Sequence, residues 1–214
     1  VNNRSYVTFR DLLIKDTTIS ATDRNIQSKI ERAFYFDGTS NNCAIRNVTM
    51  DRVGVGAFFV GPSNIMDSCD IGNMRMVRNT DDGSQPGNDD DYGANPLVVS
   101  SSNNIITHNY FHDCWAYSFD YGKDGGAIEF YGQNVDNNFI AYNKVYFNDG
   151  ITEMAGSAHN NKFVYNLFVN NGSILYVQNN ANNFMFYNNV IIENGTTTFA
   201  PGRLIGNAGG AAQS

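Results

Sequence analysis

The stretch from residue 137 to residue 195 contains one pattern three times: NNFIAYNKVYFNDG (137–150), NNKFVYNLFVNNG (160–172) and NNFMFYNNVIIENG (182–195). Each unit has two Asn residues, four mostly apolar or aromatic residues, a further Asn, a second apolar run and a polar turn that ends in Gly. The units begin 23 and 22 residues apart. A repeat of this length without helical periodicity predicts a solenoid, in which each turn is one supersecondary unit stacked on the next.

The apolar runs inside each unit are short and rich in Phe, Tyr, Val and Ile, which is typical of short β-strands. Asn, Asp and Gly tolerate left-handed backbone conformations, so each Asn is predicted to mark a bend between strands. Stacked coils place equivalent residues above one another. We therefore expect Asn143, Asn166 and Asn188 to form a column whose side-chain amides bond to the next coil and satisfy buried backbone groups.

With this Asn column the chain resembles the right-handed parallel β-helix proteins of the pectate-lyase-like superfamily, which have an internal Asn ladder. The resemblance covers most of the chain and marks the fold rather than the function. It implies an all-β, right-handed parallel β-helix of about seven coils with two loop insertions. We expect the β-helix to span residues 1–206, with a final strand at 203–205, and residues 207–214 to form a flexible, linker-like tail.

Composition limits the partners of this domain. A chain of 214 residues suits one domain, and its formal net charge of -7 without a basic cluster argues against nucleic acid as a partner. No apolar run approaches the roughly 20 residues that a membrane-spanning helix needs, so no membrane partner is expected. Neutral or weakly charged partners are favoured.

Weaker copies of the repeat precede the three clear units. Asp11 stands where the ladder Asn is expected in the first coil, residues 17–29 are predicted to be a loop, and Cys69 takes the ladder position of a later coil. Cys43 and Cys114 fall at other places in their coils. We therefore expect the three cysteines to have a packing role without a disulfide.

An acidic segment, TDDGSQPGNDDDYGAN, interrupts the repeat at residues 80–95 and is predicted to be a surface loop. Clustered carboxylates supply the oxygen ligands that calcium prefers, so a calcium site is one hypothesis, although the spacing does not match an EF-hand. A solvated acidic loop is the alternative. The candidate ligands are Asp81, Asp82, Asp89, Asp90 and Asp91.

A second insertion follows the unit at residues 103–114 and carries Trp115, Tyr117, Phe119 and Tyr121. These aromatic residues alternate with small or polar residues, so on an extended strand all four rings project to one side. Aromatic faces stack on sugar rings, and Tyr and Trp can also bond hydroxyl groups. A glycan contact is one hypothesis, and a cover for the core beneath a loop is the other.

Glu129 and Glu153 lie 24 residues apart, which is one coil. If their neighbours point into the core, both carboxylates point outward from adjacent strands about 4.8 Å apart. Such a pair could raise one pKa. Retaining glycosidases place two carboxyl groups about 5 to 5.5 Å apart, so an acid and a nucleophile are one hypothesis. Asp124 is a third candidate. The same three residues could instead accept bonds from sugar hydroxyls, hold calcium or be surface acids.

Two other chemistries receive little support from the sequence. His108 and His112 are four residues apart, but on a strand and turn they would not share a face, which argues against a zinc site. Lys123 is the one basic residue beside the acidic cluster, and no motif of a β-elimination lyase surrounds it.

Two functions compete for this predicted fold. One is a non-catalytic carbohydrate-binding module for a plant cell-wall polysaccharide, with Trp115, Tyr117, Tyr121, Asp124, Glu129 and Glu153 as ligand-binding residues. The other is a glycoside hydrolase or lyase that uses Glu129, Glu153 and Asp124. In fold, size and character the chain also resembles the xylan-directed β-helix modules of gut bacterial xylanases. That resemblance implies xylan as the ligand, an extracellular or cell-surface location, and linkage in cis to a catalytic domain.

Overall fold

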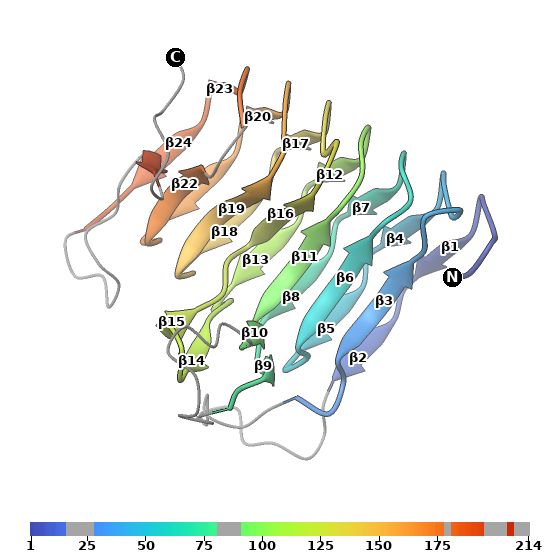
Figure 1. The fold of residues 1–214 in the computed structure, drawn as a ribbon, viewed down its shortest axis with the longest axis horizontal. Helices are drawn as coiled ribbons and strands as arrows, with labels where there is room; N and C mark the ends of the chain where they lie inside the picture. Colours follow the sequence, from blue (N-terminus) through green and yellow to red (C-terminus); the bar gives the residue numbers. More distant parts are fainter. Residues whose placement is uncertain (16–27, 81–90, 178–180, 195–204, 208–214) are drawn as a thin grey trace.

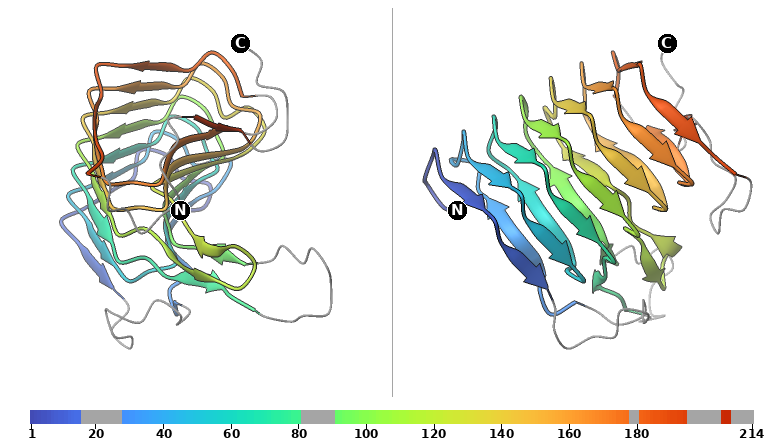
Figure 2. Two further views of the ribbon diagram at one scale, coloured as in Figure 1. Left: turned by 90° about the vertical axis from the view of Figure 1, so that its left-hand side faces the viewer. Right: turned by 180° about the vertical axis from the view of Figure 1, so that it is seen from behind.

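The computed structural model describes residues 1–15, 28–80, 91–177, 181–194 and 205–207 and consists of three long parallel sheets that wrap around one axis (Figure 1). Each coil contributes one short strand to each sheet, and successive coils stack on one another (Figure 2). Each sheet has seven strands, which confirms the all-β parallel β-helix of about seven coils. Among the described residues no helix is long and apolar enough to cross a membrane.

The three sheets are named A, B and C in the order in which the chain visits them. Sheet A contains β1 (Thr8–Arg10), β4 (Ala44–Arg46), β7 (Ile65–Asp67), β12 (Ile105–Thr107), β17 (Phe139–Ala141), β20 (Lys162–Val164) and β23 (Met185–Tyr187). Sheet B contains β2 (Leu13–Lys15), β5 (Thr49–Asp51), β8 (Asp70–Gly72), β13 (Tyr110–His112), β18 (Lys144–Tyr146), β21 (Leu167–Val169) and β24 (Val190–Ile192).

Sheet C has the longest strands and supports the face discussed below. It contains β3 (Arg32–Phe36), β6 (Val55–Phe59), β11 (Asn95–Val99), β16 (Ile128–Gly132), β19 (Gly150–Gly156), β22 (Ser173–Val177) and β25 (Ile205–Asn207). The predicted last strand at 203–205 therefore overlaps β25 only at Ile205, and residues 203, 204 and 208–214 lie outside the described residues.

Alternation along the strands of sheet C separates the core from the outer face. One inward column runs across five coils in direct register and is fully buried; it consists of Phe36, Phe59, Val99, Phe130 and Met154. The residue before each of these points to the opposite face, because successive side chains of a strand alternate. Tyr35, Phe58, Val98, Glu129 and Glu153 therefore form an outward column.

Each corner that carries a ladder residue uses two residues. The first has a positive φ, and the second points inward and bonds to the neighbouring coils, as Tyr142 (φ 60°) and Asn143 do. The Oδ1 atom of Asn143 accepts hydrogen bonds from the backbone N–H of Asn109 at 2.9 Å and from its Nδ2 at 3.0 Å. The Nδ2 atom of Asn143 donates to the Oδ1 of Asn166 at 3.0 Å and to the Ile106 carbonyl at 2.9 Å. The ladder therefore satisfies corner backbone groups that water does not reach.

Three such ladders run along the molecule, one at each corner. The first contains Cys43, Asn64, Asn104, Asn138 and Asn161, the second Cys69, Asn109, Asn143, Asn166 and Asn189, and the third Cys114, Asn148, Asn171 and Glu193. Cys69 occupies a ladder position as predicted. The other two cysteines also begin ladders, and all three are buried with free thiols.

Two ladder predictions were wrong. Asn189, not Asn188, accepts the backbone N–H of Asn166 at 2.8 Å, whereas Asn188 has a φ of 55° and is exposed. Asp11 likewise has a φ of 57°, and its Oδ1 accepts a bond from the Asn47 side chain at 2.7 Å outside the core. In both cases the predicted residue is the outer corner residue with a positive φ, a conformation that Asn and Asp also favour.

The insertions leave the β-helix at the corner between sheets B and C, where Figure 1 places β9 (Met76–Arg78), β10 (Tyr92–Gly93), β14 (Ala116–Ser118) and β15 (Gly122–Asp124) together. β9 pairs with β10, and β14 pairs with β15, both antiparallel. The side chain of Asn79 joins the two insertions, since it donates to the Tyr117 carbonyl at 2.8 Å and accepts from the Phe119 N–H at 3.0 Å.

We predict that Asn143→Ala lowers the free energy of unfolding by about 3 kcal/mol, because it leaves several buried polar groups of the adjacent coils without a partner. The midpoint of urea unfolding measures this change. Lys144→Ala, at the exposed next position, is the control and should change stability by no more than about 0.5 kcal/mol. Equal effects of the two substitutions would contradict a stabilising role of the ladder.

Candidate functional site

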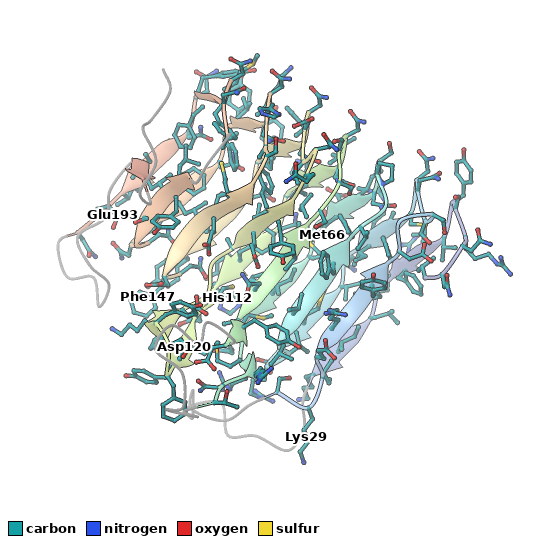
Figure 3. All side chains as sticks on the ribbon, viewed as in Figure 1. Lys29, Met66, His112, Asp120, Phe147 and Glu193 are labelled. Carbon is teal, nitrogen blue, oxygen red and sulfur yellow. The ribbon has the colours of Figure 1, made fainter. Side chains whose placement is uncertain are left out.

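A groove of about 920 Å³ lies over the outer face of sheet C. Residues of β3, β6, β11, β16, β19 and β22 line it, and residues of β10 and β15 border it on the side of the insertions. Figure 3 labels Asp120, which lies in the turn between β14 and β15, on the side of the molecule where the insertions leave the coils. The groove is therefore formed jointly by the regular repeat and by the two segments that interrupt it.

Glu129 and Glu153 are direct neighbours across β16 and β19, as the spacing of one coil predicted. Their flanking residues on both strands, Ile128, Phe130, Thr152 and Met154, are buried, while the two glutamates are partly exposed and line the groove. The outward column continues to Val98 on one side and to Tyr176 on the other.

Two aspartates complete an acidic centre with this pair. Asp124 ends β15 and accepts a hydrogen bond from the Gly125 N–H at 2.7 Å. Asp149 immediately precedes β19 and lines the same groove. The sequence prediction missed Asp149, although a signal was present: the unit at 137–150 ends in Asn-Asp-Gly, where the following units have Asn-Gly.

Burial and mutual repulsion shift the acidity of this centre. Burial, with the charges of Glu153 and Asp124, raises the pKa of Glu129 from 4.5 to about 8. Burial also raises the pKa of Asp124 from 3.8 to about 7. The hydrogen bond from the Gly125 N–H lowers this pKa, whereas the charges of Glu153 and Asp149 raise it further. The pKa of Asp149 rises to about 6 because of burial, although the Lys123 ammonium opposes the rise. Near neutral pH the groove therefore holds both proton-donating carboxyl groups and carboxylates.

The aromatic insertion does not form the extended strand that we predicted. The strand ends at Ser118, the chain turns, and β15 returns beside β14. Tyr121 is the one of the four aromatic residues among the groove-lining residues that the structure describes. Trp115 is buried at 7% exposure, whereas Tyr117 and Phe119 are exposed at 45% and 63%. The four rings consequently do not share one face.

The acidic loop can be assessed only at its end. Four of the proposed calcium ligands (Asp81, Asp82, Asp89 and Asp90) lie outside the described residues. Asp91 holds the insertions together, since its carboxylate accepts bonds from the Thr80 N–H at 2.7 Å and from the Ser118 hydroxyl at 2.7 Å. Within the described ranges no group of three or more His, Cys, Asp or Glu side chains could hold a metal ion.

The histidines belong to other parts of the surface. His108 lies at a corner and its Nδ1 is 3.0 Å from Asp67, while His112 on β13 contacts Asp70 and Asp113, each at 3.1 Å. His108 also stacks on Tyr142, whose ring centroid is 5.2 Å away. These contacts lie at sheets A and B, away from the acidic centre on sheet C.

The three sheets and the internal ladders define a parallel β-helix, and comparison with known proteins agrees. Residues 32–212 match the family described as right handed beta helix region. The match covers more than half of the 214 residues, so the chain belongs to this family. No curated protein and no solved structure matches the chain significantly.

We predict that the free energy of unfolding falls as the pH rises through the range in which the carboxyl groups of the acidic centre lose their protons. The Glu129 carboxyl has a pKa of about 8 in the folded protein against an ordinary value of 4.5. Between these values the unfolded chain releases a proton that the folded protein keeps, so its contribution is complete below about pH 4.5 and is lost by about pH 8.

Urea unfolding of the wild type and of Glu129→Gln at pH 4.5, 6.5 and 8.5 tests this linkage. The loss of stability with rising pH should be smaller in Glu129→Gln, whereas the exposed surface carboxylate variant Glu31→Gln should follow the wild type. Parallel pH curves for wild type and Glu129→Gln would contradict the prediction.

Proposed function

We propose that the groove on sheet C binds a polysaccharide and that the domain is a carbohydrate-binding module. The observation that carries this proposal is the acidic centre of Glu129, Glu153, Asp124 and Asp149 inside a groove that tyrosines also line. A protonated carboxyl group can donate to a sugar hydroxyl, and a carboxylate can accept from one. Tyrosine side chains at the same surface, such as Tyr121 and Tyr176, add apolar faces and hydroxyl groups.

The extent of the groove favours a polymer over a small molecule. Its lining residues come from six adjacent strands of sheet C, from Arg32 on β3 to Tyr176 on β22. Neighbouring strands are about 4.8 Å apart, so the groove extends about 24 Å along the helix axis. A ligand that fills this length must have repeated groups, as an extended glycan does.

The charges in the groove favour a neutral glycan. Five acidic residues line it (Asp91, Asp124, Glu129, Asp149 and Glu153), against the two basic residues Arg32 and Lys123. A polyanion would be repelled once several of these carboxyl groups are ionised. Xylan, secretion and linkage to a catalytic domain enter the proposal from the resemblance to xylan-directed β-helix modules.

Glycoside hydrolysis is the second candidate, and the raised pKa of Glu129 favours it. A general acid must keep its proton near neutral pH, and the pKa of Glu129 is about 8. Glu129 would protonate the oxygen of the scissile bond, while the adjacent Glu153 attacks the anomeric carbon, and water would then release the sugar from Glu153. Asp124, the third residue of this hypothesis, would be a further proton donor.

Two measurements distinguish these functions. The first is retention of the protein in affinity gels that contain xylan, glucan, pectin or alginate, and the second is the release of reducing and unsaturated ends from the same glycans. A binding module is retarded by a neutral glycan without product. If the wild type forms product and Glu129→Gln or Glu153→Gln does not, the protein is a hydrolase instead. No retardation and no product with any glycan would overturn both proposals.

We predict that Tyr176→Ala weakens binding to the preferred glycan about tenfold, because it removes one aromatic contact from the groove. Tyr165→Ala is the matched control, since Tyr165 is an exposed tyrosine in the corner stack with Tyr142 and should leave retention unchanged. An equal loss in both variants would argue against the groove as the binding surface.

A further inference from the structure

Lys123 is the basic residue closest in sequence to the acidic centre, and it enters the groove from β15. It pairs with Tyr117 in the β14–β15 hairpin and lines the groove next to Asp124. Asp149, on the neighbouring coil, lines the same groove. Lys123 therefore places a positive charge at the edge of the groove, beside the acidic centre.

Trp115 fixes the position of this charge. The Nζ atom of Lys123 lies 5.5 Å from the centre of the Trp115 ring, within the range of a cation–π interaction. Trp115 is itself buried and makes edge contacts with Tyr117 at 5.7 Å and Phe147 at 6.5 Å. Phe147 precedes Asp149 by two residues, so the Trp115 ring connects the hairpin that carries Lys123 to the coil that carries Asp149. Figure 3 shows Phe147 near this end of the coils.

The charged groups around Asp149 act in opposite directions. Lys123 lowers the pKa of Asp149, against burial and the Glu153 charge. At Asp124 and Glu129 the neighbouring charges that matter most are all carboxylates, and they raise both pKa values. The titratable and charged residues that line the groove are Asp91, Tyr92, Tyr121, Lys123, Asp124, Glu129, Tyr131, Asp149, Glu153, Tyr176 and Arg32.

We propose that Trp115 and Lys123 are positioning residues: the Trp115 ring holds the Lys123 ammonium at the rim of the groove, where its positive charge acts on the Asp149 carboxyl. A ligand in the groove would then meet a fixed positive charge beside the carboxyl groups. This assigns Trp115 a role beneath the site rather than the glycan contact considered from the sequence. The consequence for ligand binding rests on the proposed function, but the distribution of charge can be measured without any ligand.

NMR of the carboxyl carbons in the intact chain measures the titration midpoint of Asp149. The Asp149→Asn variant identifies the Asp149 signal, because that signal is missing from its spectrum. In Lys123→Met we expect the midpoint to rise by about one pH unit, the size of effect that a nearby charge has on a partly buried carboxyl. Trp115→Ala should raise it less, and Trp115→Phe, which keeps an aromatic face, should restore most of the wild-type value. Lys144→Met is the matched control, because Lys144 lies 4.6 Å from the Tyr110 ring on sheet B.

An unchanged Asp149 midpoint in Lys123→Met would overturn the proposal. A shift in Lys123→Met without one in a folded Trp115→Ala would overturn the role of Trp115. If Trp115→Ala does not fold, Trp115→Phe and Trp115→Leu provide the same comparison. Because these titrations use no glycan, their result is independent of whether the groove binds polysaccharide, which the retention assay decides separately.

Discussion

The hydrogen bonds of the corner ladders are the interaction on which the rest of this structure depends. A β-helix of short strands turns three times in each coil, and every turn places backbone N–H groups where water cannot reach them. A side-chain amide such as that of Asn143 accepts from the coil on one side and donates to the coil on the other. These bonds hold successive coils in direct register, so that an outward side chain on one strand lies beside its equivalent on the next.

Because the coils are in direct register, the solenoid holds the residues of the acidic centre next to one another. Glu129 and Glu153 lie side by side because β16 and β19 pair without offset. The strands β15 and β10 border the same face. Burial is the largest cause of the raised pKa of Glu129, Asp124 and Asp149. The repeat thus places the acids, and the interruptions of the repeat set their chemistry.

Particular residues show how far sequence reasoning extended. The Asn repeat predicted the fold class, and the spacing of Glu129 and Glu153 predicted their pairing, because both follow from the length of one coil. The same reasoning assigned the ladder to Asn188 instead of Asn189, since two adjacent Asn residues satisfy the pattern equally. Asp149 was missed because its importance depends on the hairpin that lies near it, and that hairpin belongs to no repeat.

The sequence by itself determined the repeat, the parallel β-helix and the outward column that carries the two glutamates. These features depend on residues separated by one coil, whose spacing is written directly in the chain. Only the tertiary structure decided that Trp115 is buried, that Lys123 lies over its ring, and that Asp149 joins the two glutamates and Asp124 in one groove. The reason is that burial and charge at this site arise where the non-repeating insertions fold back against the coils, and no local period encodes that contact.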